Sequence, residues 1–295
     1  MTDQNNNNSN GFGMDRRQFT AAAAAGTVAA SSGVMPALAD TPRRGGRFRI
    51  GWTSSGADDT LNPELYTSAN DYLRSYLVHN MLVRYGLDGG AEPDLATSWE
   101  ANADATEWTF VLREGVEFHS GKTLDAEDVI YSLNIHRGED TKSAIKGFID
   151  PIKELKADGK NIVRITLEGP NADFPTLLGQ PQAAIVPNGQ TNFNDAPDGT
   201  GPFRVKRFEP GLSFLGERHE NYWREGMPYF DEVEVVGIED TQARVNALLT
   251  GDIHYVNRVG AQSSRLIERS PTTELFVVPS KRVLGFPMML DREPS

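Results

Sequence analysis

The stretch WTFVLREGVEFHSGKTLDAEDVIYS, at residues 108–132, decides the fold of this chain. Large apolar side chains occupy every second position from Trp108 to Leu112, which is the pattern of a half-buried β-strand. Gly115 then supplies a turn, because glycine adopts positive φ without steric cost. The alternation resumes with VEF from Val116. The first half of the stretch therefore predicts two strands joined by a turn.

The second half of the same stretch predicts a helix. Asp125 is a residue type that caps helix N-termini, and Asp128 places negative charge in the first turn, where the helix dipole favours it. Apolar side chains then recur at helical spacing, at Ala126, Val129, Ile130 and Leu133. We expect this face to pack against the strands. Nothing in the stretch is catalytic, so its role is that of a scaffold.

Other segments accompany this stretch in a fixed order along the chain. They are Leu61-Asn62-Pro63, Leu82-Val83, PDLATSWE at 93–100, GTGPF at 199–203, ENYW at 220–223, Asp231-Glu232-Val233 and TGDI at 250–253. Together with residues 108–132, they resemble the family 5 extracellular solute-binding proteins, the dipeptide, oligopeptide and nickel receptors of ABC importers. The resemblance runs from about residue 47 to residue 291.

The resemblance implies an α/β fold like that of type II periplasmic binding proteins, with mixed β-sheet lobes joined by a hinge. The expected organisation is a first lobe formed by residues 40–88 and 197–270, a second lobe formed by residues 89–196, and the start of a third lobe at 271–295. Glycine-rich segments at 86–92 and 199–202 are the expected crossings between the first two lobes. Family members continue beyond this point, so we expect a truncated chain whose third lobe is largely missing. A natural short form is the alternative.

Shorter patterns predict the elements around the lobes. Strands are expected at 47–52, 162–167, 203–208, 213–218, 232–238 and 253–256, with a further segment starting at Leu275. A helix is expected at 70–82 from its apolar spacing. Another is expected after Thr241 as its cap, ending at Gly251.

The first 39 residues read as an export signal rather than a domain. Arg16 and Arg17 precede an alanine-rich apolar segment that ends in Ala37-Leu38-Ala39. This pattern is typical of a twin-arginine signal peptide, with cleavage after Ala39. An uncleaved helix or membrane anchor is the alternative, but a membrane span needs about 20 strongly apolar residues. We therefore expect export by the twin-arginine translocase and a periplasmic location.

Composition narrows the classes of function. The chain has no cysteine, which excludes disulfides and thiolate metal sites. Its formal net charge of −12 argues against nucleic acid or an anionic membrane as a partner, because both require a basic surface. The five histidines form no HExxH or HxH motif, and no G-x-S-x-G elbow or phosphate-binding loop is present. We expect no catalytic residues, no bound metal and no cofactor.

A binding protein needs only a concave pocket with aromatic walls and a few polar groups. The loop containing Ser54 and Ser55 leaves the carboxyl end of the first strand, where α/β sheets place ligands. Tyr66 matches a residue that faces the ligand in the nickel-receptor branch, although a core aromatic side chain is an equal alternative. Gln180 and Gln182 stand where that branch contributes an arginine, so bidentate carboxylate recognition of a metal chelate is not expected from them.

The family resemblance implies a receptor that closes on a peptide or similar small solute between its lobes and presents it to an ABC permease and ATPase. A periplasmic ligand sensor or a chaperone-like peptide binder would share this fold and remains open. An inactive fragment is the third possibility, because residues that decide the solute would lie in the third lobe.

Overall fold

The computed structural model describes residues 42–53, 56–86 and 88–277. Its largest sheet, called sheet A here, has the strand order β11-β1-β10-β9-β8. Strand β1 pairs in parallel with β10 and β11, and the pairs β10–β9 and β9–β8 are antiparallel. The strands of sheet A are β1 (Arg47–Trp52), β8 (Phe203–Glu209), β9 (Ser213–Arg218), β10 (Glu232–Gly237) and β11 (Tyr255–Val256).

A second sheet, sheet C, is antiparallel throughout and has the order β4-β5-β7-β6. All its strands come from the part of the chain between β1 and β8. They are β4 (Ala96–Ala101), β5 (Glu107–Leu112), β6 (Ile152–Ala157) and β7 (Ile162–Leu167). A separate two-stranded ribbon pairs β2 (Val83–Tyr85) with β3 (Ala91–Pro93).

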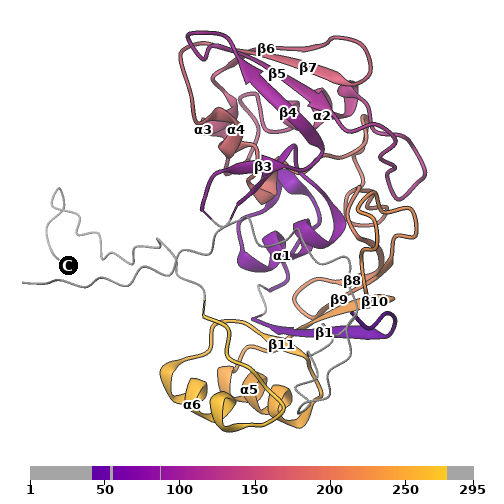
Figure 1. The fold of residues 1–295 in the computed structure, drawn as a ribbon, viewed down its shortest axis with the longest axis vertical. Coiled ribbons are helices and arrows are strands. Elements are labelled where there is room, and N and C mark those ends of the chain that lie inside the picture. Colours follow the sequence, from indigo (N-terminus) through magenta and orange to yellow (C-terminus); the bar gives the residue numbers. More distant parts are fainter. Residues whose placement is uncertain (1–41, 54–55, 87, 278–295) are drawn as a thin grey trace, which may run out of the picture. The chain divides into compact units, whose positions relative to one another are not determined.

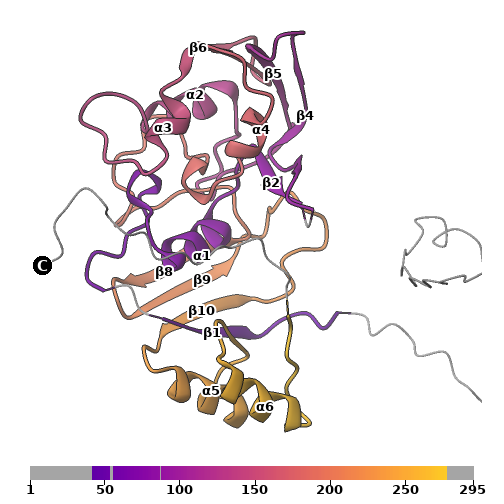
Figure 2. The same ribbon diagram turned by 90° about the vertical axis from the view of Figure 1, so that its left-hand side faces the viewer.

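Helices cover both faces of sheet A. In two views at right angles, α1 lies on one side of this sheet, and α5 and α6 lie on the other (Figures 1 and 2). The remaining helices lie beside sheet C. The α-helices are α1 (Ala69–Val78), α2 (Ala126–Asn134), α3 (Lys146–Ile149), α4 (Phe174–Leu177), α5 (Thr241–Thr250) and α6 (Ala261–Arg269); short 3-10 helices span η1 (Pro63–Leu65) and η2 (Pro181–Ala183).

Each sheet has its own apolar core. Phe214, Val233 and Val235 of sheet A pack with Val78 of α1, and Phe110 and Val163 of sheet C belong to a second cluster together with α2. Val78 belongs to the first core and Leu82 to the second. The chain therefore passes from one core to the other at residues 79–81, before the segment 86–92 in which the sequence placed the crossing.

The stretch at residues 108–132 folds as predicted except at its second strand. Trp108, Phe110 and Leu112 are buried along β5, and Gly115 adopts a φ of 73°. Residues 116–118 form only an isolated bridge between Glu117 and Thr123. The prediction of a strand here is wrong because β4 and β7 already occupy both edges of β5. The segment therefore pairs with itself across a short loop.

Two helix boundaries differ from the predictions, namely the end of α1 and the start of α5. Helix α1 ends at Val78 instead of continuing to residue 82, because His79 is extended at the passage between the cores. Helix α5 is capped by Asp240, whose side chain accepts a hydrogen bond from Ala243 N, so Thr241 is its first residue and not its cap. Gly251 ends α5 in the left-handed conformation with a φ of 81°, as predicted.

The carboxyl-terminal predictions are met only in part. The strand expected at 253–256 is confined to Tyr255–Val256. From Leu275 to Val277 the described chain has no regular structure, and residues beyond 277 lie outside the described part.

The cap of α2 provides a stability prediction. The Asp125 side chain accepts hydrogen bonds from Glu127 N and Asp128 N. In the opposite direction, Asp125 N donates to the Asp128 carboxylate at 2.9 Å. We expect Asp125→Ala to lower the free energy of unfolding by about 1 kcal/mol, because the cap is lost. Asp125→Ser keeps a capping oxygen and should retain most of the stability. Urea denaturation of both variants tests this, and equal losses would show that the cap is not responsible.

Candidate functional site

The two cores are joined where residues 78–80 run against residues 199–201. Gly201 N donates a hydrogen bond to Val78 O at 2.9 Å, and the Thr200 hydroxyl donates to Asn80 Oδ1 at 3.3 Å. We call this contact the junction. Both passages of the chain between the cores therefore meet at one place.

The junction leaves no room for side chains at its glycines. A Cβ on Gly199 would lie 2.6 Å from His79 Nδ1, and a Cβ on Gly201 would lie 2.6 Å from His79 N and nearer still to the carbonyl carbon of Val78. Real Cβ contacts are not this short, so the two backbones approach closely only because both positions are glycine.

Asn80 is the polar centre of the junction. Its amide nitrogen donates to both carboxylate oxygens of Asp94 at 3.3 Å and lies 3.5 Å from the Tyr222 hydroxyl. Its side-chain oxygen accepts a hydrogen bond from Trp223 Nε1 at 3.1 Å, and its backbone oxygen accepts one from Ile185 N at 2.9 Å. One side chain thus links segments that lie more than a hundred residues apart.

Three histidines surround the same glycines. His119 and His219 both place a ring nitrogen on the carbonyl oxygen of Gly201, at 3.0 and 3.3 Å, and their rings meet edge to face at 4.9 Å. Neither ring nitrogen of His79 has a hydrogen-bond partner among the described residues. Burial lowers the pKa of His79 to about 3 and that of His119 to about 4, so both rings are neutral at pH 7.

A pocket of about 500 Å³ opens beside the junction. Residues 79–81 form part of its wall, together with α1, β2 and the segment 222–230. Its aromatic walls are Tyr76, Tyr85, Phe203, Tyr222, Tyr229 and Phe230. Its charged groups are Arg84, Asp94 and Arg224. An apolar concave surface with a few fixed polar groups is the usual form of a small-molecule site.

The charged groups of the pocket are held in different ways. Arg224 donates a hydrogen bond to Asp94 at 2.7 Å, and its guanidinium stacks on the ring of Trp223. The guanidinium of Arg113 also lies over the Trp223 ring, 4.3 Å from its centre. Burial raises the pKa of Asp94, and the nearby Arg224 guanidinium opposes this rise. Arg84 instead pairs with Glu92 at 2.6 Å, and both side chains are about half exposed, at 49% and 43%.

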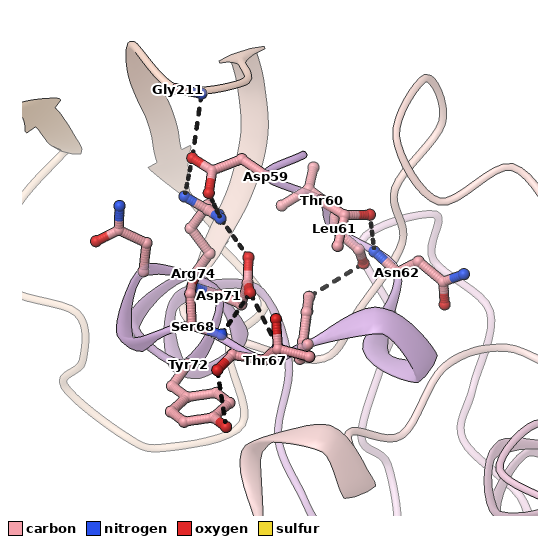
Figure 3. A network of polar contacts seen from close by, with 12 residues as sticks. Asp59, Thr60, Leu61, Asn62, Thr67, Ser68, Asp71, Tyr72, Arg74 and Gly211 are labelled. Carbon is pink, nitrogen blue, oxygen red and sulfur yellow. Dashed lines mark hydrogen bonds and ion pairs between the residues drawn. The ribbon is translucent and has the colours of Figure 1, made fainter. Parts of the chain in front are cut away.

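A second polar network lies where the chain leaves β1, the loop in which the sequence predicted a ligand site (Figure 3). Arg74 of α1 pairs with Asp71 at 2.6 Å and with Asp59 at 3.1 Å, and Asp59 also accepts from Gly211 N at 3.1 Å. The three charged side chains are at most 5% exposed. Because they satisfy one another, this network fixes the loop on α1 and sheet A rather than offering a free charge.

The predicted binding residues fall into two groups. Tyr66 is fully buried and its hydroxyl donates to Leu61 O at 3.0 Å, which places it in the packing role that the sequence left open. Gln182 is 4% exposed and donates to Tyr66 O at 3.2 Å and to the Tyr72 hydroxyl at 3.1 Å. The structure therefore brings Tyr66 and Gln182 together, but in the interior.

Gln180 lies apart from this interior pair. Its side chain opposes the rise that burial causes in the pKa of Tyr85, one of the aromatic walls of the pocket. Ser54, Ser55, Arg16, Arg17 and the cleavage point after Ala39 lie outside the described residues.

Sequence reasoning missed the pocket and Asn80. Asp94 and Tyr222 stood in segments that carried the family resemblance, but nothing in their local pattern shows that they meet Asn80 and Arg224. In the described part of the chain, no group of three or more His, Cys, Asp or Glu side chains is placed to hold a metal ion. No helix within that part is long and apolar enough to cross a membrane.

Two cored α/β units joined by a double crossing, with a pocket at the crossing, are the architecture of a solute-binding protein. The chain belongs to the bacterial extracellular solute-binding proteins of family 5, whose middle region matches residues 90–294. Two proteins of similar sequence carry the names of binding proteins.

Among proteins of similar sequence is the nickel-binding periplasmic protein of Escherichia coli, 33% identical over 202 residues, which are 65% of this chain and 38% of that protein. The probable D,D-dipeptide-binding periplasmic protein DdpA of E. coli is 28% identical over 243 residues, covering 76% of this chain and 46% of that protein. The chain therefore spans less than half the length of these relatives.

Solved structures give the same result for the fold. AgaA of A. tumefaciens R10, in complex with agropinic acid, matches with a TM-score of 0.72 and 30% identity over 77% of this chain and 46% of AgaA. The oligopeptide-binding protein AppA of Bacillus subtilis, in complex with a nonapeptide, matches with a TM-score of 0.70 and 25% identity over 78% of this chain and 47% of AppA. The predicted mixed α/β fold of a periplasmic binding protein is confirmed.

The junction glycines give a second prediction. Gly201→Ala should lower the free energy of unfolding by about 3 kcal/mol or more, because the new methyl group meets backbone that cannot move without separating the two passages. Gly147→Ala is the matched control: nothing lies within 4 Å of its Cβ, and its place in α3 favours alanine. Thermal and urea unfolding measure both. Equal effects would mean that the junction is not tightly packed.

The neutral histidines give a third prediction. In the unfolded chain they take up protons below their ordinary pKa of 6.5, whereas in the folded chain His79 does so only near 3. Stability should therefore be full above pH 6.5 and fall as the pH drops toward 3, by about 1.4 kcal/mol per pH unit for each histidine. His79→Leu should lose less stability than the wild type between pH 7 and pH 4.5 in urea denaturation. Identical losses would show that His79 does not contribute.

Proposed function

We propose that the chain belongs to an exported solute-binding receptor of an ABC importer, which captures a peptide or similar small solute and delivers it to a membrane permease and its ATPase. The observation that carries this proposal is the family match over residues 90–294. It is supported by relatives whose names specify nickel and D,D-dipeptides and by solved relatives in complex with a nonapeptide and agropinic acid.

The mechanism we propose is closure of lobes about the double crossing. The lobes are those predicted from the sequence, residues 40–88 with 197–270 and residues 89–196, and residues 271–295 would begin a third. A solute that contacts both sides of a cleft favours the closed form by its differential affinity for it, and closure excludes water. The junction supports this proposal because both passages of the chain between the cores meet there.

The solute contacts we propose follow the predicted residues as far as their placement allows. Gln180 acts on Tyr85, which lines the pocket, and Ser54 and Ser55 follow the last residue of β1 in the sequence. Tyr66 would act by holding the end of this loop, because its buried hydroxyl donates to Leu61 O, and Gln182 would support Tyr66 by donating to its backbone oxygen.

Export through the twin-arginine translocase and a periplasmic location complete the proposal. Arg16 and Arg17 with the Ala37-Leu38-Ala39 segment support it, and the relatives named as periplasmic proteins agree with it.

A ligand screen tests the receptor function. Dipeptides, oligopeptides, nickel with histidine, and glycosides are added to the exported chain, and its melting temperature is measured. A true ligand at a concentration 100 times its Kd should stabilise the folded state by about 2.7 kcal/mol. Tryptophan fluorescence serves as a second readout. If no solute raises the melting temperature, the receptor proposal loses its support.

A further inference from the structure

The pocket beside the junction has an excess of hydrogen-bond donors. Among the residues that line it, Asp94 is the one carboxylate, and its oxygens already accept from Arg224, from the Asn80 amide and from Met81 N. A cationic ligand would have to displace these internal donors from a carboxylate that is only 4% exposed. The pocket therefore lacks a free anionic group to receive a cation.

The donors, in contrast, are available. Arg84 is held by a half-exposed pair with Glu92, and pairs of this kind contribute only about 0–1 kcal/mol, so the guanidinium can change partner at little cost. Tyr76 adds a phenol hydroxyl; burial raises its pKa to about 12, with a further contribution from Tyr85, so it stays protonated and can donate at pH 7. Arg224 adds further N–H groups beyond the one it gives to Asp94.

The floor of the pocket carries an unpartnered polar side chain. His79 lines the pocket and is 1% exposed, and both of its ring nitrogens lack a hydrogen-bond partner among the described residues. Burying such a group without a partner is unfavourable by about 1–3 kcal/mol. Both ring nitrogens are enclosed, so this penalty belongs to the folded chain itself and does not select a ligand.

The walls set the shape of the ligand. Tyr76, Tyr85, Tyr222 and Tyr229 face a space of about 500 Å³, and aromatic faces favour a flat or cyclic apolar body. The residues that line the pocket include two guanidinium groups and one carboxylate, and Glu92, the partner of Arg84, lies outside this lining.

From these observations we propose that the pocket binds a small organic acid: a carboxylate that pairs with Arg84 and Arg224, attached to a flat ring held between the tyrosines. Its biological use as a solute site rests on the proposed function, but the binding itself does not. The pocket is distinct from the interior position of Tyr66 and Gln182, and Gln180 is the predicted site residue that adjoins it through Tyr85.

The test compares three probes of the same size and different charge: benzoate, benzamide and benzylamine. Each is titrated into the full chain by isothermal calorimetry at low salt and again at 0.5 M salt. Benzoate should bind more tightly than the other two, and its affinity should fall as salt rises, because the contact is an ion pair. Tighter binding of benzylamine, or equal affinity for benzoate and benzamide, would overturn the proposal.

Two charge variants locate the site. Arg84→Gln should weaken benzoate binding about tenfold, because one of the two guanidinium partners is lost. Glu92→Gln removes the competitor of Arg84 and does not line the pocket, so it should leave benzoate affinity unchanged or increase it. Both positions are about half exposed, and melting temperatures without probe will confirm that both variants fold. Equal weakening by both variants, or by neither, would overturn the assignment.

The outcome separates this inference from the receptor function. If a solute from the ligand screen binds wild type and Arg84→Gln equally well and benzoate does not bind, the receptor stands and the organic-acid pocket falls. If benzoate behaves as expected and no solute from the screen binds, the pocket stands and the receptor proposal falls.

Discussion

The close approach of two backbone segments, residues 78–80 and 199–201, is the constraint on which the rest of the described structure depends. Gly199 and Gly201 permit it, and the hydrogen bond from Gly201 N to Val78 O holds it. Both passages of the chain between the two cores meet at this contact, so it ties the part of the chain that contains sheet A to the part that contains sheet C. The pocket exists for the same reason, since residues 79–81 form its wall as they leave the junction.

Burial at the junction forces its polar groups to satisfy one another. Asn80 accepts from Thr200 and Trp223 while donating to Asp94, and Arg224 compensates the buried carboxylate. Networks of this kind fix one arrangement because each member becomes unfavourable when its partner moves. His79 differs from these junction residues, because it lines the pocket and neither of its enclosed ring nitrogens has a hydrogen-bond partner among the described residues.

The sequence predicted those elements whose causes are local. The alternation of β5, the Asp125 cap of α2 and the glycine that ends α5 depend on neighbouring residues, and all three are present. The strand predicted at 116–118 failed because its existence depends on which strands flank β5, and those come from other parts of the chain. Helix α1 ends early for a similar reason, since the passage at His79 is set by the distant Gly199 and Gly201.

The site was less predictable than the fold because it is assembled from several separate segments. Arg84 and Asp94 belong to one part of the chain, while Arg224 arrives from more than a hundred residues away. The two arginines of the assembled pocket differ in how firmly they are held. Arg224 is fixed by Asp94 and by stacking on Trp223, whereas Arg84 is exposed and weakly paired. A carboxylate entering the pocket would meet Arg224 already in position, so the side-chain freedom lost on binding would come mainly from Arg84.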